Sequence, residues 1–354
     1  MCRRGEPSCP GGHLRDMEKV PFLDYKEVLV TGGTGFLGRH VCRALIARGV
    51  LPRLLVRTGS EERIPDDVRR ACRVTPGDVT VREFVENAAQ STEAVVHLAG
   101  IIREFPAKGV TFERVHVEGT RNAVHAARAW GIRRFVHVSA LGAYAGDPAG
   151  YFDSKGRAED IVRESGLDWT IFRPAGIFGP GDSFISGLAS AVRKAPLFPV
   201  PGDGSFFMQP VFVRDVVKGI VDSLARPDTE RCSYDVGGPE QIPYEELADR
   251  IAASVGVRLR KVHIPVRRLR RAAGFLSRFE TFPLSPEMLD VLVAGNTCDH
   301  KAYCSSFGFA PTPLSRYLAA SQGTGQMQGG AGPDEREDEI RGGGEESSRS
   351  REVA

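Results

Sequence analysis

The chain has 354 residues and a mass of 38.5 kDa, and 41% of its residues are hydrophobic and 26% charged. These fractions exclude a mostly disordered or collagen-like chain, and without a run of about 18 apolar residues no membrane-spanning helix is predicted. The net charge of +2 is unevenly distributed, because residues 258–278 hold eight basic and no acidic residues while residues 322–354 are net −4. Nucleic-acid-binding proteins are usually basic over a whole face, so this distribution argues against a nucleic-acid partner.

The cysteines and the N-terminal segment indicate the expected compartment. Seven cysteines are scattered without a CxxC pair or a Cys/His cluster, so no metal site is predicted. The first 23 residues carry several charged side chains and lack an apolar core, which is unlike a secretory signal. A cytoplasmic protein is therefore expected.

Both ends of the chain are expected to lie outside the folded part. Residues 1–23 are predicted to be a disordered extension, and residues 322–354 a disordered acidic tail, because the tail offers too little apolar surface to offset its ordering entropy. Between them, we expect a cofactor-binding domain over residues 24–182. A C-terminal substrate lobe is expected over residues 183–321, sharing some strands with the first domain.

Predicted strands and helices alternate along the first half of the chain. Short apolar strands are predicted at residues 27–31, 51–56, 94–98, 134–139 and 169–172. Amphipathic helices are predicted between them at residues 36–48, 111–130 and 153–165. This alternation predicts an α/β, Rossmann-type doubly wound parallel sheet. Later helices, separated by Pro- and Gly-rich loops, predict the smaller C-terminal lobe; they cover residues 184–194, 213–225 and 244–255.

A glycine-rich turn follows the first predicted strand and opens the first predicted helix. The segment Thr31-Gly-Gly-Thr-Gly-Phe-Leu-Gly38 fits G-x-G-x-x-G from Gly33 and G-x-x-G-x-x-G from Gly32. Glycine permits a tight turn and the close approach of a pyrophosphate to backbone N–H groups. The helix N-terminus adds free donors. In this strand–turn–helix context, the motif predicts a dinucleotide-binding site.

The residue that ends the second strand favours NADP(H) over NAD(H). An acidic residue there would bind the adenosine ribose hydroxyls, whereas an arginine would pair with a 2′-phosphate. Arg57 occupies this position, and Arg39 follows the last glycine of the motif. NAD(H) is kept as the alternative, because both arginines could be solvated surface side chains. Asp78 and Val79 form a turn that either meets the adenine amino group or is an ordinary Asx turn.

A tyrosine and a lysine have the spacing of an acid/base pair. Tyr151 and Lys155 are four residues apart and so share one face of a helix. A neighbouring ammonium stabilises tyrosinate, so Lys155 is expected to lower the pKa of the phenol and make it a usable acid/base. Ser139 closes a predicted strand, where its hydroxyl would polarise a substrate carbonyl beside Tyr151.

These motifs together resemble the short-chain dehydrogenase/reductase superfamily, in particular its extended and atypical branches, which include NAD-dependent epimerases and dehydratases. The resemblance covers about residues 26–321 and is carried by the turn Thr31–Gly38, His97-Leu-Ala-Gly100, Gly119-Thr-Arg-Asn122, Ser139, Tyr151 with Lys155, and Arg173–Pro180. Other segments more narrowly resemble bacterial relatives of the NADPH-binding accessory subunit of respiratory complex I. They are Gly100–Glu104, Phe112–Thr120, Pro199–Pro210 with Val211–Asp215, and Tyr234–Pro239.

The resemblance implies roles for individual residues. Ser139, Tyr151 and Lys155 would form a catalytic triad, with Lys155 also holding the cofactor ribose. His116 stands where many members have an asparagine that contributes to proton relay or helix geometry. The resemblance and the motif arguments together give these cofactor-binding candidates: Gly32, Thr34, Gly35, Phe36, Leu37, Gly38, Arg39, Arg57, Asp78, Val79, Ala99, Gly100, Lys155, Pro174 and Ile177.

The predicted function is an NAD(P)(H)-binding oxidoreductase that transfers a hydride to or from a small-molecule substrate, with Tyr151 as the acid/base. The sequence does not identify that substrate. One alternative is a nucleotide-sugar epimerase or dehydratase, which would use transient oxidation at the same tyrosine. The other alternative is a non-catalytic NADPH-binding accessory or assembly factor linked to respiratory complex I or quinone metabolism.

A basic amphipathic helix is predicted at residues 266–279. Its arginines, including those of Arg267–Arg271, lie opposite an apolar stripe. Such a helix lies on an anionic membrane, receives a partner such as a respiratory complex, or simply covers the substrate lobe with solvated arginines. If it binds lipid, the protein is expected at the inner face of the membrane.

Overall fold

The structure is a computed structural model, and it describes residues 23–194, 197–276 and 285–322. The predicted disordered ends lie outside the described residues except for Leu23 and Gln322. Leu23 is buried in the core, with 3% of its surface exposed, so the ordered part begins at least one residue before the expected boundary.

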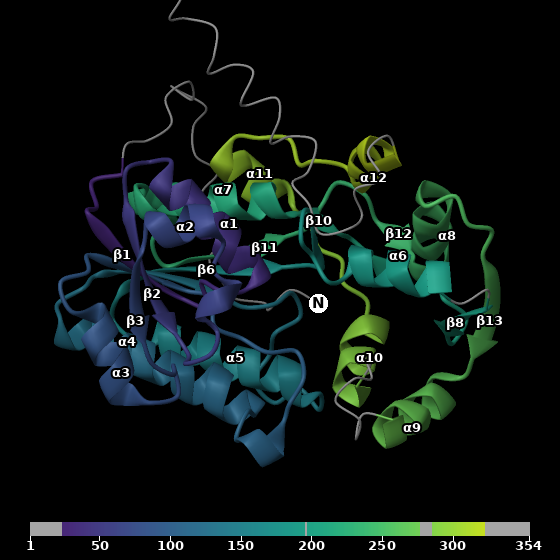
Figure 1. Cartoon of the computed structure of the whole chain (residues 1–354), viewed down its shortest axis with the longest axis horizontal. Coiled ribbons are helices and arrows are strands. Elements are labelled where there is room, and N and C mark those ends of the chain that lie inside the picture. Colours follow the sequence, from purple (N-terminus) through teal and green to yellow (C-terminus); the bar gives the residue numbers. More distant parts are fainter. Residues whose placement is uncertain (1–22, 195–196, 277–284, 323–354) are drawn as a thin grey trace, which may run out of the picture.

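A seven-stranded parallel sheet forms the centre of the molecule (Figure 1). Its strand order is β11-β6-β5-β4-β1-β2-β3, and every neighbouring pair is parallel. The predicted fold class is therefore confirmed. The seven strands are β1 (Glu27–Thr31), β2 (Leu51–Val56), β3 (Arg73–Pro76), β4 (Ala94–His97), β5 (Arg134–Val138), β6 (Asp168–Pro174) and β11 (Cys232–Val236).

Helices cover both faces of this sheet, because alternate strand residues point to opposite sides. In β1, Val28 and Val30 belong to one apolar core and Leu29 to the other. The first core includes α1 (Phe36–Ile46) and α7 (Val213–Leu224), which pack against each other. The second lies beneath α3 (Arg82–Ala89), α4 (Gly119–Ala129) and α5 (Gly150–Arg163). Figure 1 shows these two groups of helices on opposite sides of the strands.

Two of the predicted helices differ from the observed ones near the carboxyl ends of the strands. The predicted helix at 111–130 begins as a π-helix, Glu113–Glu118, which continues into α4. A π-helical turn is rare and is often found at a functional site. The predicted helix at 153–165 begins earlier, at Gly150, so Tyr151 lies in its first turn.

The C-terminal part forms a smaller lobe beside the sheet (Figure 1). It contains two parallel strands, β8 (Leu197–Pro201) and β13 (Arg260–Ile264), and an antiparallel pair, β9 (Phe207–Met208) and β12 (Ile242–Pro243). A further short strand, β10 (Val211–Phe212), pairs with β7 (Ile177–Phe178). Three C-terminal helices have no counterpart in the sequence prediction: α10, α11 and α12. The lobe's helices are α6 (Ile185–Lys194), α8 (Tyr244–Ser254), α9 (Val266–Leu276), α10 (Pro286–Val293), α11 (Lys301–Phe307) and α12 (Leu314–Gln322).

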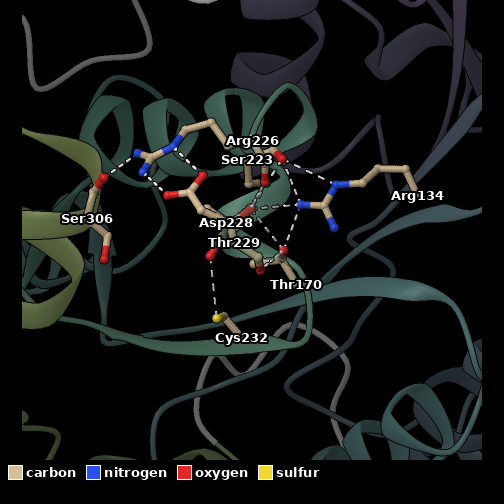
Figure 2. Close-up of polar contacts among 8 residues, drawn as sticks. All are labelled: Arg134, Thr170, Ser223, Arg226, Asp228, Thr229, Cys232 and Ser306. Atoms are coloured by element: carbon tan, nitrogen blue, oxygen red, sulfur yellow. Dashed lines mark hydrogen bonds and ion pairs between the residues drawn. The ribbon is translucent and has the colours of Figure 1, made fainter. Parts of the chain in front are cut away.

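A buried arginine ties the end of α7 to the central sheet. Arg134, in β5, donates to the Ser223 carbonyl at the end of α7 and to the hydroxyls of Thr170 and Thr229. Figure 2 shows its guanidinium inserted among these groups. Because the side chain is only 5% exposed, its charge is compensated by hydrogen bonds rather than by water. The residues expected in the C-terminal lobe thus share a continuous core with the sheet.

None of the helices in the described ranges is both long and apolar enough to cross a membrane. Among the same residues, no group of three or more His, Cys, Asp or Glu side chains is arranged to hold a metal ion.

Candidate active site

The glycine-rich turn connects β1 to α1 where the strand order reverses between β1 and β4. Ligands of open α/β sheets bind at such a reversal. Gly32 has a φ of +72°, and a Cβ there would lie 2.8 Å from the Leu98 carbonyl carbon. A Cβ at Gly38 would lie 2.3 Å from the Gly32 carbonyl oxygen. Backbone atoms cannot move aside at these distances, so only glycine fits at Gly32 and Gly38. With Gly35 between them, these positions have the G-x-x-G-x-x-G spacing.

The N-terminus of α1 offers donors for an anion. Its N-cap residue is Gly35, which has no side chain to accept from the first-turn N–H groups, and that turn holds no acidic residue. The predicted residues Thr34, Phe36 and Leu37 line this turn and are partly buried. Uncapped N–H groups together with the positive end of the helix dipole suit a pyrophosphate. The observed local geometry therefore fits a dinucleotide.

The two predicted specificity arginines have different surroundings. Arg57 follows β2 and is exposed. Arg39 lies in α1, where its Nη2 donates to the Gly181 carbonyl over 3.4 Å and its buried Nε has no partner in the described part of the chain. Arg39 is thus partly used to hold the loop after β7 (Ile177–Phe178), whereas Arg57 is available to a ligand.

Asp78 forms an Asx turn, one of the two interpretations left open by the sequence. Its Oδ1 accepts from the Thr80 N–H over 2.9 Å. The next residue, Val79, packs against Gly119 at the junction of the π-helix and α4, and its carbonyl accepts from Asn122. This turn lies at the carboxyl end of β3, on the same edge of the sheet as the glycine-rich turn.

Ala99 and Gly100 follow β4, and Gly100 is in close contact with Lys155. A Cβ at Gly100 would lie 3.1 Å from the Lys155 Nζ and 3.6 Å from the His116 Nε2. The Nζ donates to the Val138 carbonyl over 3.1 Å, which is its single hydrogen bond within the described residues. Burial lowers the pKa of this ammonium to about 8. Its remaining N–H groups are therefore suited to hydroxyls of a bound ribose.

Tyr151 is packed among aromatic rings with its hydroxyl unpaired. Its ring centroid lies 5.7 Å from those of Phe112 and His116 and 5.3 Å from that of Phe152, each in an edge-to-face arrangement. No hydrogen bond in the described ranges involves the phenol oxygen. Burial raises the pKa of the phenol to about 12. The expected lowering of that pKa by Lys155 is therefore wrong for the protein without its ligands, because loss of solvation dominates.

His116 is held by hydrogen bonds on both ring nitrogens. The Ile101 N–H donates to Nε2 over 3.0 Å, so the proton of the neutral ring is on Nδ1, which donates to Ser154 Oγ over 2.8 Å. Ser154 in turn donates to the Tyr151 carbonyl. Burial holds the pKa of the imidazole down to about 2, so the ring stays neutral. His116 thus fixes the first turn of α5 and has no free proton for a relay.

Ser139 lies beside Glu159, two helical turns from Tyr151 along α5. Ser139 is buried and its hydroxyl has no hydrogen-bond partner among the described residues, but it contributes to a lowered pKa of the Glu159 carboxyl. Burial alone would raise that pKa, but the Arg173 guanidinium at 2.8 Å, together with Ser139 and Arg163, outweighs the effect of burial. Ser139 also directly follows Val138, whose carbonyl accepts from the Lys155 Nζ. The structure thus brings Tyr151 and Lys155 together on one helix, with Ser139 next to a residue that contacts Lys155.

Two stacked histidines lie beneath this site. His97 and His137 are neighbours on β4 and β5, with ring centroids 5.4 Å apart. His97 is hydrogen-bonded to the hydroxyls of Thr31 and Thr120, whereas neither nitrogen of His137 has a partner in the described part of the chain. Burial lowers the pKa of both rings, to about 3 for His97. Both are therefore neutral at physiological pH.

The last two predicted cofactor residues lie on the β6 side of the site. Pro174 ends β6 and accepts from the Leu141 N–H over 3.0 Å. Ile177 begins β7 and is partly buried. All the predicted site residues therefore lie at or just beyond the carboxyl ends of parallel strands, or on the helices that follow them.

Sequence reasoning missed Ser154 and Glu159. Glu159 is four residues after Lys155 and eight after Tyr151, so helical spacing would have placed it on the same face of α5. Ser154 could not have been found by spacing, because its role depends on the π-helix that turns His116 towards it.

Three comparisons with known proteins agree with this geometry. The family described as NAD(P)H-binding matches residues 32–183. Over 173 residues the chain is 39% identical to ceramide reductase from Caulobacter vibrioides, covering 49% of this chain and 53% of that protein. Over 258 residues it is 27% identical to the mitochondrial NADH-ubiquinone oxidoreductase 40 kDa subunit of Neurospora crassa, covering 72% and 67%. The chain thus aligns with about half of the reductase and two thirds of the subunit.

The fold is also found in a solved enzyme. UDP-glucose 4-epimerase from Thermotoga maritima superimposes with a TM-score of 0.66, covering 84% of this chain and 97% of that one, at 20% identity. At this identity the likeness concerns the fold alone. Residues 32–183 thus match the NAD(P)H-binding family, and the chain has the fold of the epimerase-like, extended short-chain dehydrogenases/reductases.

Proposed function

We propose that this chain is an NADP(H)-dependent reductase that interconverts a carbonyl and a hydroxyl group on a lipid. The single observation that carries the proposal is the arrangement of Lys155, Gly100 and Tyr151. The buried ammonium of Lys155 has unused N–H groups and lies against Gly100, which has no side chain to block it. The phenol of Tyr151, which has no hydrogen-bond partner in the described ranges, lies one turn away on the same helix. The similarity to a ceramide reductase supports a lipid as the substrate class.

The chain's own residues would divide the work as follows. The first turn of α1 would hold the pyrophosphate, and Lys155 the ribose beside the nicotinamide. When bound, the cofactor supplies or accepts the hydride. Tyr151 would give its proton to the substrate carbonyl oxygen as the carbonyl carbon is reduced, so that a hydroxyl forms. The nearby ammonium of Lys155 would stabilise the tyrosinate left behind.

The preference for NADP(H) rests on Arg57. Its guanidinium is exposed at the carboxyl end of β2, where the adenosine ribose lies in dinucleotide-binding folds. No acidic side chain stands at that position to bind an unmodified ribose. A 2′-phosphate would therefore be favoured over a free hydroxyl.

The test of the proposed reaction uses the purified full chain with NADPH and a panel of long-chain ketones and 3-oxo lipids. Tyr151→Phe is expected to lower kcat by at least about a hundredfold, because general acid catalysis contributes that much, while NADPH binding is retained. Tyr144→Phe is the matched control, since Tyr144 is 51% exposed and lies outside the helix. Equal activity of Tyr151→Phe and the wild type would defeat the proposal.

A second candidate function is favoured by one observation. His116 is hydrogen-bonded at both ring nitrogens, so this group of the expected relay is committed to structural contacts. A nucleotide-bound accessory factor, contacting a respiratory complex through Arg267–Arg271, would need no relay. NADPH that copurifies, resists exchange and is not oxidised by any member of the panel would support this function. Conversion of UDP-sugars would instead support the epimerase alternative.

A further inference from the structure

One side of α9 combines exposed arginines with an exposed aromatic ring. Arg267, Arg268, Arg271 and Phe275 share the outer face of this helix, because they are spaced by four and seven or eight residues. We call these four residues the basic face. All are exposed, and 61% of the Phe275 surface is accessible. The opposite side of α9, which includes the buried Ala273, packs towards α10.

The arginines of the basic face have no ion-pair partner among the described residues. Two nearby carboxylates are bound by other side chains, since Asp290 binds Arg270 and Asp249 binds Lys261. In the part of the chain that the structure describes, no carboxylate lies within 4.0 Å of Arg267, Arg268 or Arg271. Three uncompensated charges on two helical turns create a local positive potential that calls for an anionic surface.

The strand before α9 extends this arrangement. β13 runs beside β8 and leads through Pro265 into α9, on the outer side of the C-terminal lobe (Figure 1). In the register of this pair, Leu197 lies opposite Arg260, and Pro199 opposite Val262. Residues in register share a face of the sheet, and all four are exposed, Leu197 by 58% and Val262 by 42%. Three exposed apolar side chains therefore accompany one exposed arginine on this face.

We propose that the basic face of α9, with the outer face of β8 and β13 beside it, docks on the surface of a lipid bilayer that contains anionic headgroups. Helices that lie in the interfacial layer of a bilayer carry arginine or lysine together with aromatic or aliphatic side chains. Here arginines and apolar side chains are interspersed, which suits a headgroup layer in which guanidinium groups meet phosphates while Phe275 reaches towards the acyl chains.

Docking at this position would serve the proposed reaction. α10 packs against both α9 and α5, the helix that carries Tyr151. A bilayer in contact with α9 would thus be separated from the helix of the candidate site only by α10. The inference rests on the proposed function only for the lipid substrate, since binding to vesicles requires no turnover.

The experiment is flotation of the purified full chain with vesicles of phosphatidylcholine, and with vesicles that contain 30% phosphatidylglycerol. We expect the chain to float with the anionic vesicles and to remain behind with the neutral ones. The triple variant Arg267→Gln, Arg268→Gln, Arg271→Gln is expected to bind the anionic vesicles about a hundredfold more weakly, since each arginine contributes roughly fivefold near such a surface. The single variant Phe275→Ser is also expected to bind the anionic vesicles more weakly than the wild type, but with the same dependence of binding on salt concentration.

The matched control removes three arginines from the other side of the molecule. Arg70, Arg121 and Arg128 are exposed on α2 (Asp66–Arg70) and α4, and their glutamine variants change the net charge equally. This control is expected to float like the wild type. Equal losses in both triple variants would reduce the effect to net charge, and absence of flotation with anionic vesicles would reject a lipid surface. Activity on a soluble short-chain ketone, measured on the same samples, separates either result from failure of the proposed reaction.

Discussion

A Cβ on Gly100 would lie 3.1 Å from the Lys155 Nζ, closer than ordinary van der Waals contact, so a side chain there would push the ammonium aside. The glycine keeps open the space into which the ammonium's unused N–H groups point, next to the carboxyl end of β4.

Gly100→Ala is expected to weaken NADPH binding about tenfold, because a methyl group would displace a charged hydrogen-bonding group, at about 1.4 kcal/mol or more. No positive φ is found at Gly100, so the backbone accepts alanine and the melting temperature should change little. NADPH fluorescence titration and thermal melting measure the two effects.

The control for this substitution is Gly187→Ala. Gly187 lies in α6 with open space where the new Cβ would be, so alanine there is expected to stabilise the helix slightly and leave NADPH binding unchanged. Unchanged NADPH binding by Gly100→Ala would mean that the cofactor does not bind next to Gly100 and Lys155.

Lys155→Met is expected to stabilise the protein without its ligands at pH 7. Burial lowers the pKa of Lys155 from 10.5 to about 8, so the unfolded chain holds a proton that the folded chain releases between these values. The wild type should therefore gain stability as the pH rises from 8 to 10.5, by about 3 kcal/mol at most. Urea unfolding at pH 7, 9 and 10.5 would follow this gain, which Lys155→Met should lack. Parallel pH profiles for the two proteins would contradict the prediction.

The sheet and the nucleotide-binding turn could be predicted because their signals are local. β1 and β2 were expected with the bounds that the structure has, since each is a short apolar run between polar turns. The glycine spacing likewise reports a steric requirement that the structure displays in the contact of Gly38 with the Gly32 carbonyl.

The catalytic grouping could not be predicted in the same way, because it depends on tertiary contacts. Ser139 was expected to close the strand but follows β5, which ends at Val138, and its neighbour Glu159 comes from α5, which spacing within the strand does not reveal. Burial of Tyr151 by Phe112 and His116 depends on the π-helix, which has no distinct sequence periodicity. Spacing along a helix therefore identified the pair Tyr151 and Lys155 but gave the wrong direction for the pKa of the phenol.

His137→Leu is expected to leave stability at pH 7 unchanged or to raise it by about 1 kcal/mol. The imidazole is fully buried with no partner for either nitrogen in the described ranges, and an unsatisfied buried polar group is costly. Burial also holds the pKa of this ring well below 6.5, so the folded protein loses stability as the pH falls below 6.5. Below pH 6.5, the free energy of unfolding of His137→Leu should therefore fall less steeply with pH than that of the wild type, by about 1.4 kcal/mol per pH unit.

Denaturant unfolding of the two proteins at pH 7.5, 6 and 5 provides the measurement for His137. A comparison with His116→Leu serves as the control, since that ring makes two hydrogen bonds and its loss should destabilise the protein at every pH. A large destabilisation by His137→Leu at pH 7.5 would indicate that the ring has a partner after all.

Tyr151 is expected to remain a phenol below pH 10 in the protein without its ligands, since burial raises its pKa to about 12. The absorbance at 295 nm, compared between the wild type and Tyr151→Phe, reports the phenolate of this residue. The difference between the two titrations should be flat from pH 6 to 10. A step with a midpoint below 9 would instead indicate that Lys155 dominates the environment of the phenol.

Arg57→Ala is expected to weaken NADPH binding about tenfold while leaving NADH binding nearly unchanged, since an exposed guanidinium–phosphate pair is worth about 1–2 kcal/mol. The loss should shrink at 0.5 M salt, because exposed charges are screened. Arg70→Ala, at another exposed position, tests whether total charge matters. Because Arg39 is partly committed to the Gly181 carbonyl, Arg39→Ala should weaken NADPH binding less than Arg57→Ala. A preference for NADH in the wild type that persists in Arg57→Ala would overturn the assignment of the cofactor.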